Sequence, residues 1–65
     1  MLNLVKGTYN AWCTGANGKQ YRVVAIAGKW RLCVYSGLNR DEWLFVDDVE
    51  YPTQDAALAV VDTQP

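Results

Sequence analysis

The stretch KQYRVVAIAGKWRLCVYS, residues 19–36, decides the fold of this 65-residue chain. Residues 19–27 and 30–36 are two runs rich in β-branched and aromatic side chains, as is typical of β-strands. Between them stands Gly28-Lys29, with glycine at the first position of a two-residue turn, as a type II′ hairpin requires. The sequence therefore predicts an antiparallel hairpin at the centre of the fold.

The predicted turn also decides which side chains of the hairpin share a face. It pairs Ala27 with Trp30, Ala25 with Leu32 and Val23 with Val34, which makes one face wholly apolar. The opposite face carries a mixed set suited to water or to a partner: Arg22, Val24, Ile26, Arg31, Cys33 and Tyr35. A second two-residue turn, at Asn17-Gly18, would place Trp12 opposite Val23 on the apolar face.

Outside the hairpin, the chain offers two more strands and a helix. Residues 7–14 and 42–46 have strand-like composition, and Thr53 is a suitable N-cap for an alanine-rich helix that continues to Asp62. The helix would pack on the apolar face through Ala57, Leu58 and Val61. We expect one α+β domain over residues 1–65, a four-stranded antiparallel meander with one C-terminal helix packed on one face (ββββα). The pattern leaves open which face Trp43 and Phe45 occupy, and whether residues 42–46 pair with the third strand or the first.

Composition narrows the class of protein further. Apolar residues make up 51% of the chain, with three Trp, four Tyr and one Phe, which argues against disorder in so short a sequence. No run reaches the length of a signal-peptide core or a membrane span, so we expect a soluble, cytoplasmic protein. The two cysteines lack a CxxC spacing and a histidine partner, and we expect both to stay reduced.

The charges are separated along the chain. All six Lys and Arg lie within residues 1–40, and all seven Asp and Glu lie from residue 41 onward, so a net charge of −1 hides a strongly polarised sequence. Positive and negative charges mixed along the chain would keep a protein equally soluble, so solubility does not explain the separation. The separation favours a molecule that presents a charged surface to a partner.

Nothing in the sequence supports catalysis. There is no histidine, no GxSxG, no phosphate-binding loop and no spacing of metal ligands. The adjacent Asp47-Asp48 could serve as an acid and base or hold a cation, but neighbouring side chains of an extended segment point to opposite sides. A solvated turn is the better interpretation, and we expect no enzyme, no cofactor and no metal site.

Carboxylates interleaved with aromatic residues provide the main candidate for a binding surface. Such a surface suits a basic site on a protein partner, because charge steers the encounter and aromatic rings anchor the complex. The candidate partner-binding residues are Asp41, Glu42, Trp43, Asp47, Asp48, Glu50 and Tyr51, with Tyr35 from the preceding strand.

Two alternatives depend on the other half of the chain. The bases Lys19, Arg22, Lys29 and Arg31 lie on one hairpin and loosely resemble those of arm-binding and AP2-like DNA-binding domains. The seven acids would repel phosphate, so direct nucleic-acid binding is not our expectation. The other alternative is a homo-oligomer that covers Val24, Ile26, Cys33 and Tyr35, although we expect a monomer or at most a weak dimer.

In size, composition and charge layout, the chain resembles the small anti-CRISPR proteins of phages and mobile elements. The resemblance includes no diagnostic motif and carries no residue role onto this sequence. It implies a non-catalytic inhibitor that acts in the cytoplasm of a bacterial host. Such an inhibitor would occupy a basic, nucleic-acid-binding site on a protein complex, for example a subunit of a type I CRISPR effector, in the manner of a DNA mimic.

Overall fold

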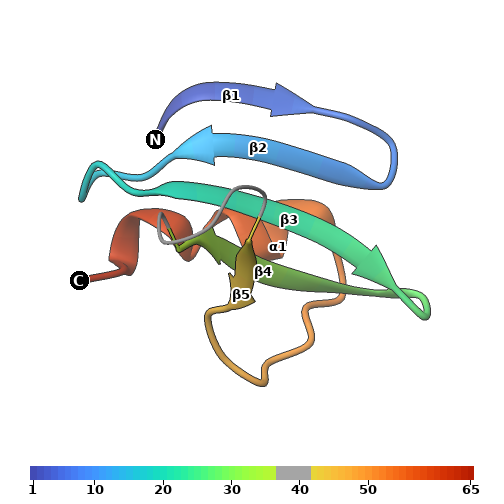
Figure 1. Cartoon of the computed structure of the whole chain (residues 1–65). Coiled ribbons are helices and arrows are strands. Elements are labelled where there is room, and N and C mark those ends of the chain that lie inside the picture. The colour runs from blue at the N-terminus through green and yellow to red at the C-terminus, as the bar shows by residue number, and fades with distance from the viewer. Residues whose placement is uncertain (37–41) are drawn as a thin grey trace.

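The computed structural model describes residues 1–36 and 42–65. Figure 1 shows an antiparallel sheet with a short helix behind it. The five strands follow one another in the sheet in sequence order: β1 (Leu2–Lys6), β2 (Asn10–Thr14), β3 (Gln20–Ile26), β4 (Lys29–Tyr35) and β5 (Trp43–Phe45). The helix α1 (Gln54–Leu58) and a 3₁₀ turn (Val61–Thr63) complete the chain. The α+β class and the meander are confirmed, but the predicted number of four strands is wrong.

The additional strand is β1, at the free edge of the sheet. All five of its residues are exposed, and its pairing with β2 shifts register between Leu2 and Val5. Asn3, within that shift, has a φ of 56°, a left-handed conformation that asparagine tolerates better than most residues. A short, solvated and irregular strand lacks the alternation by which sequence analysis recognises strands.

The central hairpin forms as predicted, but its turn lies one residue earlier. Ala27 and Gly28 both have positive φ, 51° and 79°, so the turn is of the type I′ class and not type II′. The register accordingly pairs Ala25 with Trp30, Val23 with Leu32 and Tyr21 with Val34. The predicted pairs were therefore displaced by two residues, which leaves every side chain on the face where it was expected.

Trp12, in contrast, lies on the face opposite to the one predicted. The β2–β3 connection is longer than a two-residue turn, since Gly15 donates to Lys19 across it, and Thr14 pairs with Gln20. Trp12 consequently pairs with Arg22, while Ala11 takes the place opposite Val23. A change of one residue in loop length reverses the face of every residue in a strand.

The hydrophobic core lies between the sheet and the C-terminal segment. Val23 and Leu32 of the sheet and Ala57, Leu58 and Val61 of that segment are almost fully buried, which confirms the predicted packing of the helix. Thr53 caps α1, and its hydroxyl accepts a hydrogen bond from the backbone N–H of Ala56 at 3.0 Å. The α-helix is shorter than predicted. It ends at Leu58 and not at Asp62, and a 3₁₀ turn follows at Val61–Thr63. Within residues 1–36 and 42–65, no helix is long and apolar enough to cross a membrane.

The last strand settles the alternatives that the sequence left open. β5 pairs with β4, placing Trp43 beside Tyr35, Leu44 beside Val34 and Phe45 beside Cys33. Trp43 and Phe45 therefore lie on the face away from α1.

Gly15 provides a test of this packing. A Cβ at this position would lie 2.7 Å from Cε2 of Tyr21, a ring that is only 2% exposed and whose hydroxyl accepts a hydrogen bond from the Asn17 side chain. We expect Gly15→Ala to lower the free energy of unfolding by about 1–3 kcal/mol, as overpacking does. Urea denaturation followed by circular dichroism measures this loss. Ala16→Ser, at the neighbouring exposed position, should change it by less than about 0.5 kcal/mol, and equal effects of the two would refute the predicted clash.

Candidate binding face

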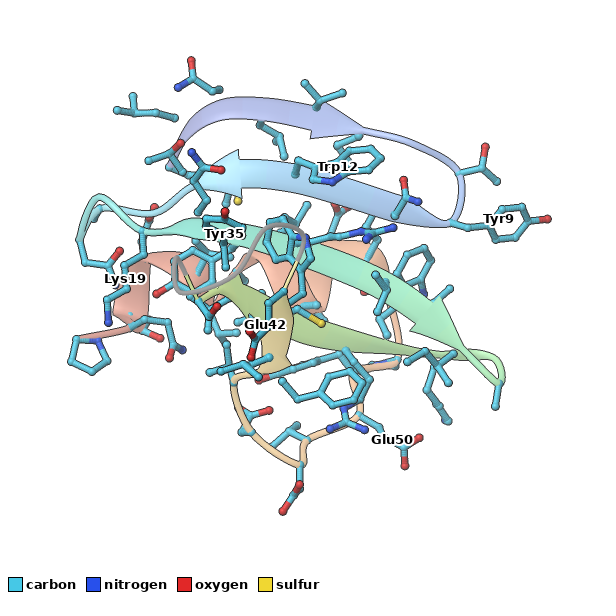
Figure 2. All side chains as sticks on the ribbon, in the orientation of Figure 1. Tyr9, Trp12, Lys19, Tyr35, Glu42 and Glu50 are labelled. Atoms are coloured by element: carbon cyan, nitrogen blue, oxygen red, sulfur yellow. The ribbon has the colours of Figure 1, made fainter. Side chains whose placement is uncertain are left out.

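The sheet face turned away from α1 is here called the open face, and no helix in the described part of the chain covers it (Figure 2). The side chains that the strand pairing places on it include Val5, Trp12, Arg22, Val24, Arg31, Cys33, Tyr35, Trp43 and Phe45. Trp12, Tyr35 and Phe45 are 39%, 36% and 52% exposed. The open face therefore presents a large, partly solvated aromatic surface.

Both arginines of the open face lie against aromatic rings. The guanidinium carbon of Arg31 is 4.1 Å from the ring centroid of Phe45, and that of Arg22 is 5.4 Å from the ring centroid of Trp12. These distances are within the range of cation–π attraction. Arg31 also donates a hydrogen bond to the backbone carbonyl oxygen of Asp47 at 2.8 Å. The contacts restrain both guanidinium groups on the open face.

The arginines keep unused hydrogen-bonding capacity. The Nε atoms of Arg22 and Arg31 are buried, and neither has a partner among the described residues. Within the same residues, the two ion pairs join Lys6 to Asp55 and the amino group of Met1 to Asp62, and neither involves the open face. The guanidinium groups of Arg22 and Arg31 are thus part of the aromatic surface of the open face.

Cys33 lies between the two arginines and is only 6% exposed. Burial raises the pKa of its thiol, and the nearby charges of Arg22 and Arg31 oppose that rise in part. Cys13 lies on the other side of the sheet, in the core, where burial also raises its thiol pKa. Both cysteines are free. A two-residue turn at Asn17-Gly18 predicts that both lie on the open face, which is wrong for Cys13, because the longer β2–β3 connection turns it to the core.

The burial of both thiols predicts a specific pH dependence. An unfolded thiol ionises before a folded one when burial raises the folded pKa, so the free energy of unfolding should fall as pH rises above about 8.5. Between about pH 8.5 and 10, the free energy of unfolding should fall less steeply in a Cys13→Ala/Cys33→Ala variant than in the parent protein. Urea denaturation at each pH measures this difference. Iodoacetamide should label the folded protein slowly and label both thiols rapidly in urea. Rapid labelling of either thiol in the native protein would contradict the burial.

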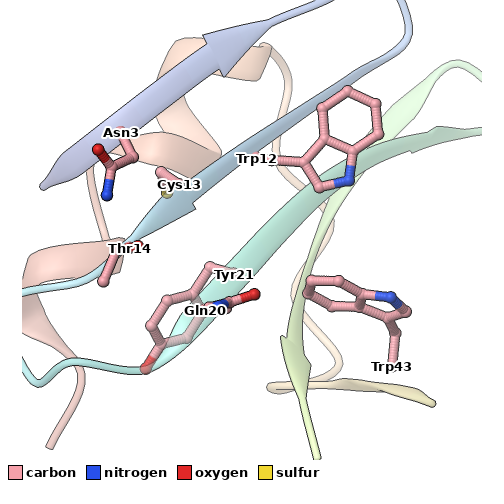
Figure 3. A pocket seen from close by; sticks show the side chains of 7 residues that line it. All are labelled: Asn3, Trp12, Cys13, Thr14, Gln20, Tyr21 and Trp43. Atoms are coloured by element: carbon pink, nitrogen blue, oxygen red, sulfur yellow. The ribbon is translucent and has the colours of Figure 1, made fainter. Parts of the chain in front are cut away.

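A cavity of about 250 Å³ opens on the same side of the sheet. Figure 3 shows the indoles of Trp12 and Trp43 on one side of it, Asn3 and Thr14 on the other, and Gln20 between them. Tyr35 packs against Trp43 with ring centroids 5.5 Å apart and an interplanar angle of 60°. This contact helps to hold the indole of Trp43 in place.

The predicted acidic residues do not form one cluster. Glu42 precedes β5, whereas Asp47, Asp48 and Glu50 follow it, so the strand separates them. Asp41 lies outside the described residues. Asp48 and Glu50 are exposed, but Asp47 has a structural task, since its carboxylate accepts a hydrogen bond from the backbone N–H of Val49 at 3.1 Å.

Tyr51 belongs to the other side of the sheet. It forms a bridge with Trp30 and packs against the core, and its hydroxyl lies 3.5 Å from the Asp47 carboxylate. Burial, followed by the charge of Asp47, raises the pKa of the Tyr51 hydroxyl. Of the aromatic candidates, the structure thus brings Tyr35 and Trp43 together and leaves Tyr51 apart from them.

Trp12 and Phe45 are the binding-face residues that sequence reasoning did not select. Trp12 was assigned to the core because of the assumed loop length, and the face of Phe45 was undecided. The alternation along residues 22–35 did place Arg22, Val24, Arg31, Cys33 and Tyr35 correctly.

Comparison of the chain with protein-family models, with curated proteins and with solved structures gave no match.

Proposed function

We propose that this chain is a non-catalytic binding protein whose open face, together with the acidic residues at the ends of β5, contacts a protein partner. The observation that carries the proposal is the uncovered sheet face with two tryptophans, a tyrosine, a phenylalanine and two arginines. Trp, Tyr and Arg are the residue types enriched where interfaces concentrate their binding energy. A monomer rarely exposes so continuous an aromatic surface without a use for it.

The partner class follows from the acidic residues beside that face. Asp48 and Glu50 are exposed in the loop after β5, next to the edge where Phe45 lies. Their charges would guide the approach of a basic surface, while Trp43 and Phe45 would supply the buried centre of the contact. We propose the basic, nucleic-acid-binding surface of a protein complex as the partner, which agrees with the resemblance to small anti-CRISPR inhibitors and makes a type I CRISPR effector one such target.

Neutralising the exposed acids tests the charge part of this proposal. Asp48→Asn/Glu50→Gln should reduce capture of the partner from a nuclease-treated bacterial lysate and weaken its dependence on salt. Asp48 and Glu50 are exposed and outside the core, so the variant should fold normally. We expect a decrease in association rate of about 3- to 10-fold, read by surface plasmon resonance with the captured protein.

A matched control removes the same number of charges elsewhere. Asp55→Asn/Asp62→Asn also raises the net charge by two, but both carboxylates serve exposed ion pairs on the other side of the molecule. Such pairs contribute little to stability, so this variant should also fold and should bind like the parent. If the two double variants lose association rate equally, net charge alone is responsible and the acidic contact is disproved.

A further inference from the structure

The cavity between Trp12 and Trp43 has the composition of a site for a flat, hydrogen-bonding ring. Its walls are two indoles from β2 and β5, strands that are not neighbours in the sheet (Figure 3). At about 250 Å³ it is smaller than the roughly 300–1,000 Å³ of sites for drug-sized ligands. The size suits one planar group, lying against an indole.

The polar lining of the cavity is unused. In residues 1–36 and 42–65, no hydrogen bond engages the side-chain amide of Asn3 or Gln20 or the hydroxyl of Thr14, although other amides of the chain are bonded. Each amide offers a donor and an acceptor side by side, which matches the edge of a nucleobase. Asn3 lies at the β1 irregularity, where its left-handed backbone takes it out of the regular ladder and toward the cavity.

Positive charge lies beside the indoles. Arg22 packs against Trp12, and its Nε has no partner among the described residues. A guanidinium beside an aromatic cavity would complement a phosphate attached to the bound ring.

We infer that this cavity binds a nucleobase of single-stranded nucleic acid, with the base stacked on an indole and its edge turned to Asn3 and Gln20. Proteins recognise unpaired bases by this combination of aromatic stacking, polar edge contacts and nearby arginine. The seven acids of the second half of the chain weaken any general attraction for phosphate, so stacking supplies most of the affinity. The inference does not depend on the proposed protein-binding role, and because both contacts use Trp43, the bound base and the protein partner would compete for the open face.

The test is a titration of the complete protein with a single-stranded DNA oligonucleotide of about eight nucleotides, followed by tryptophan fluorescence. A duplex of the same sequence and a nucleoside monophosphate are titrated in parallel. We expect the single strand to quench fluorescence and the duplex to bind at least tenfold more weakly, because paired bases cannot enter the cavity. Trp12→Ala and Trp43→Ala should each weaken binding by about 5- to 100-fold, the effect of losing one stacked base.

Two further variants keep the test decisive. Gln20→Glu places a carboxylate at an exposed position of the cavity without touching the core and should also weaken binding at least fivefold, even if an alanine variant misfolds. Tyr9→Ala removes an aromatic side chain that is 74% exposed and lies outside the cavity, and it should bind like the parent. Equal affinities for single strand and duplex, or unchanged affinity in Trp12→Ala, Trp43→Ala and Gln20→Glu, would overturn the inference. A further result would also overturn the inference. The parent protein would not bind the oligonucleotide, and the variants would lose only their affinity for the captured protein, which would show that the cavity receives a protein side chain.

Discussion

Leu32→Ala is expected to remove much of the stability of this domain. Leu32 is fully buried at the centre of β4, opposite Val23 and in the cluster that includes Ala57 and Val61. Truncating a buried leucine removes its transfer free energy and leaves a cavity, which together cost about 2–5 kcal/mol. A domain of this size has only about 3–10 kcal/mol in total. Urea denaturation followed by circular dichroism should therefore show a large fall in the transition midpoint, or a chain that is already unfolded.

Leu44→Ala is the matched control for that result. Leu44 is a leucine of the neighbouring strand on the same side of the sheet, but it is 50% exposed. Its truncation removes less buried area and should cost about 1 kcal/mol or less. Equal losses from the two variants would place the core elsewhere than between the sheet and the C-terminal segment.

Trp43→Ala is expected to produce the largest loss of partner binding. Trp43 lies on the open face, is supported by Tyr35 and stands next to Phe45 along β5, so it has the position of a central anchor. Truncating such an anchor typically costs at least about 2 kcal/mol, which corresponds to roughly a 30-fold weaker Kd. The measurement is surface plasmon resonance with the protein captured from nuclease-treated lysate. Because β5 is a short edge strand, the fold should persist, which circular dichroism verifies.

Tyr9→Ala serves again as the control, since Tyr9 is an exposed aromatic residue between β1 and β2 and not on the open face. It should bind the captured protein with unchanged affinity. A loss of affinity shared by both variants would indicate nonspecific binding through exposed aromatic residues and would argue against a defined contact face.

Most of the fold follows from residues 19–36 together with the capped helix. Their alternation assigns the faces of two strands correctly even though the turn is displaced, because a shift of two residues preserves side-chain parity. Trp12 could not be assigned in this way. Its face depends on whether the loop that follows β2 has an even or odd number of residues, and Gly15, Asn17 and Gly18 are all compatible with more than one turn. β1 carries no alternation at all, since every residue in it is exposed.

The binding face is harder to read from the sequence than the fold. The separation of charges along the chain directs attention to residues 41–55, but strand pairing brings Arg22 and Arg31 to the same surface as Trp43 and Phe45. The acids are divided between the two ends of β5, and Asp47 stabilises its own loop. Linear charge order therefore does not tell which side chains share a surface, because neighbours in a sheet come from distant parts of the chain.

The most direct test of the central claim uses the three tryptophans as reporters. Trp12 and Trp43 lie on the open face, and Trp30 lies on the opposite side against the core. Protein labelled with 5-fluorotryptophan should give three ¹⁹F resonances, assigned with single Trp→Phe variants. On addition of the captured protein partner, we expect the resonance of Trp43 to shift and that of Trp30 to stay in place. A complex that shifts Trp30 and leaves Trp43 and Trp12 unchanged would show that the partner binds elsewhere and would contradict the open face as the site of contact.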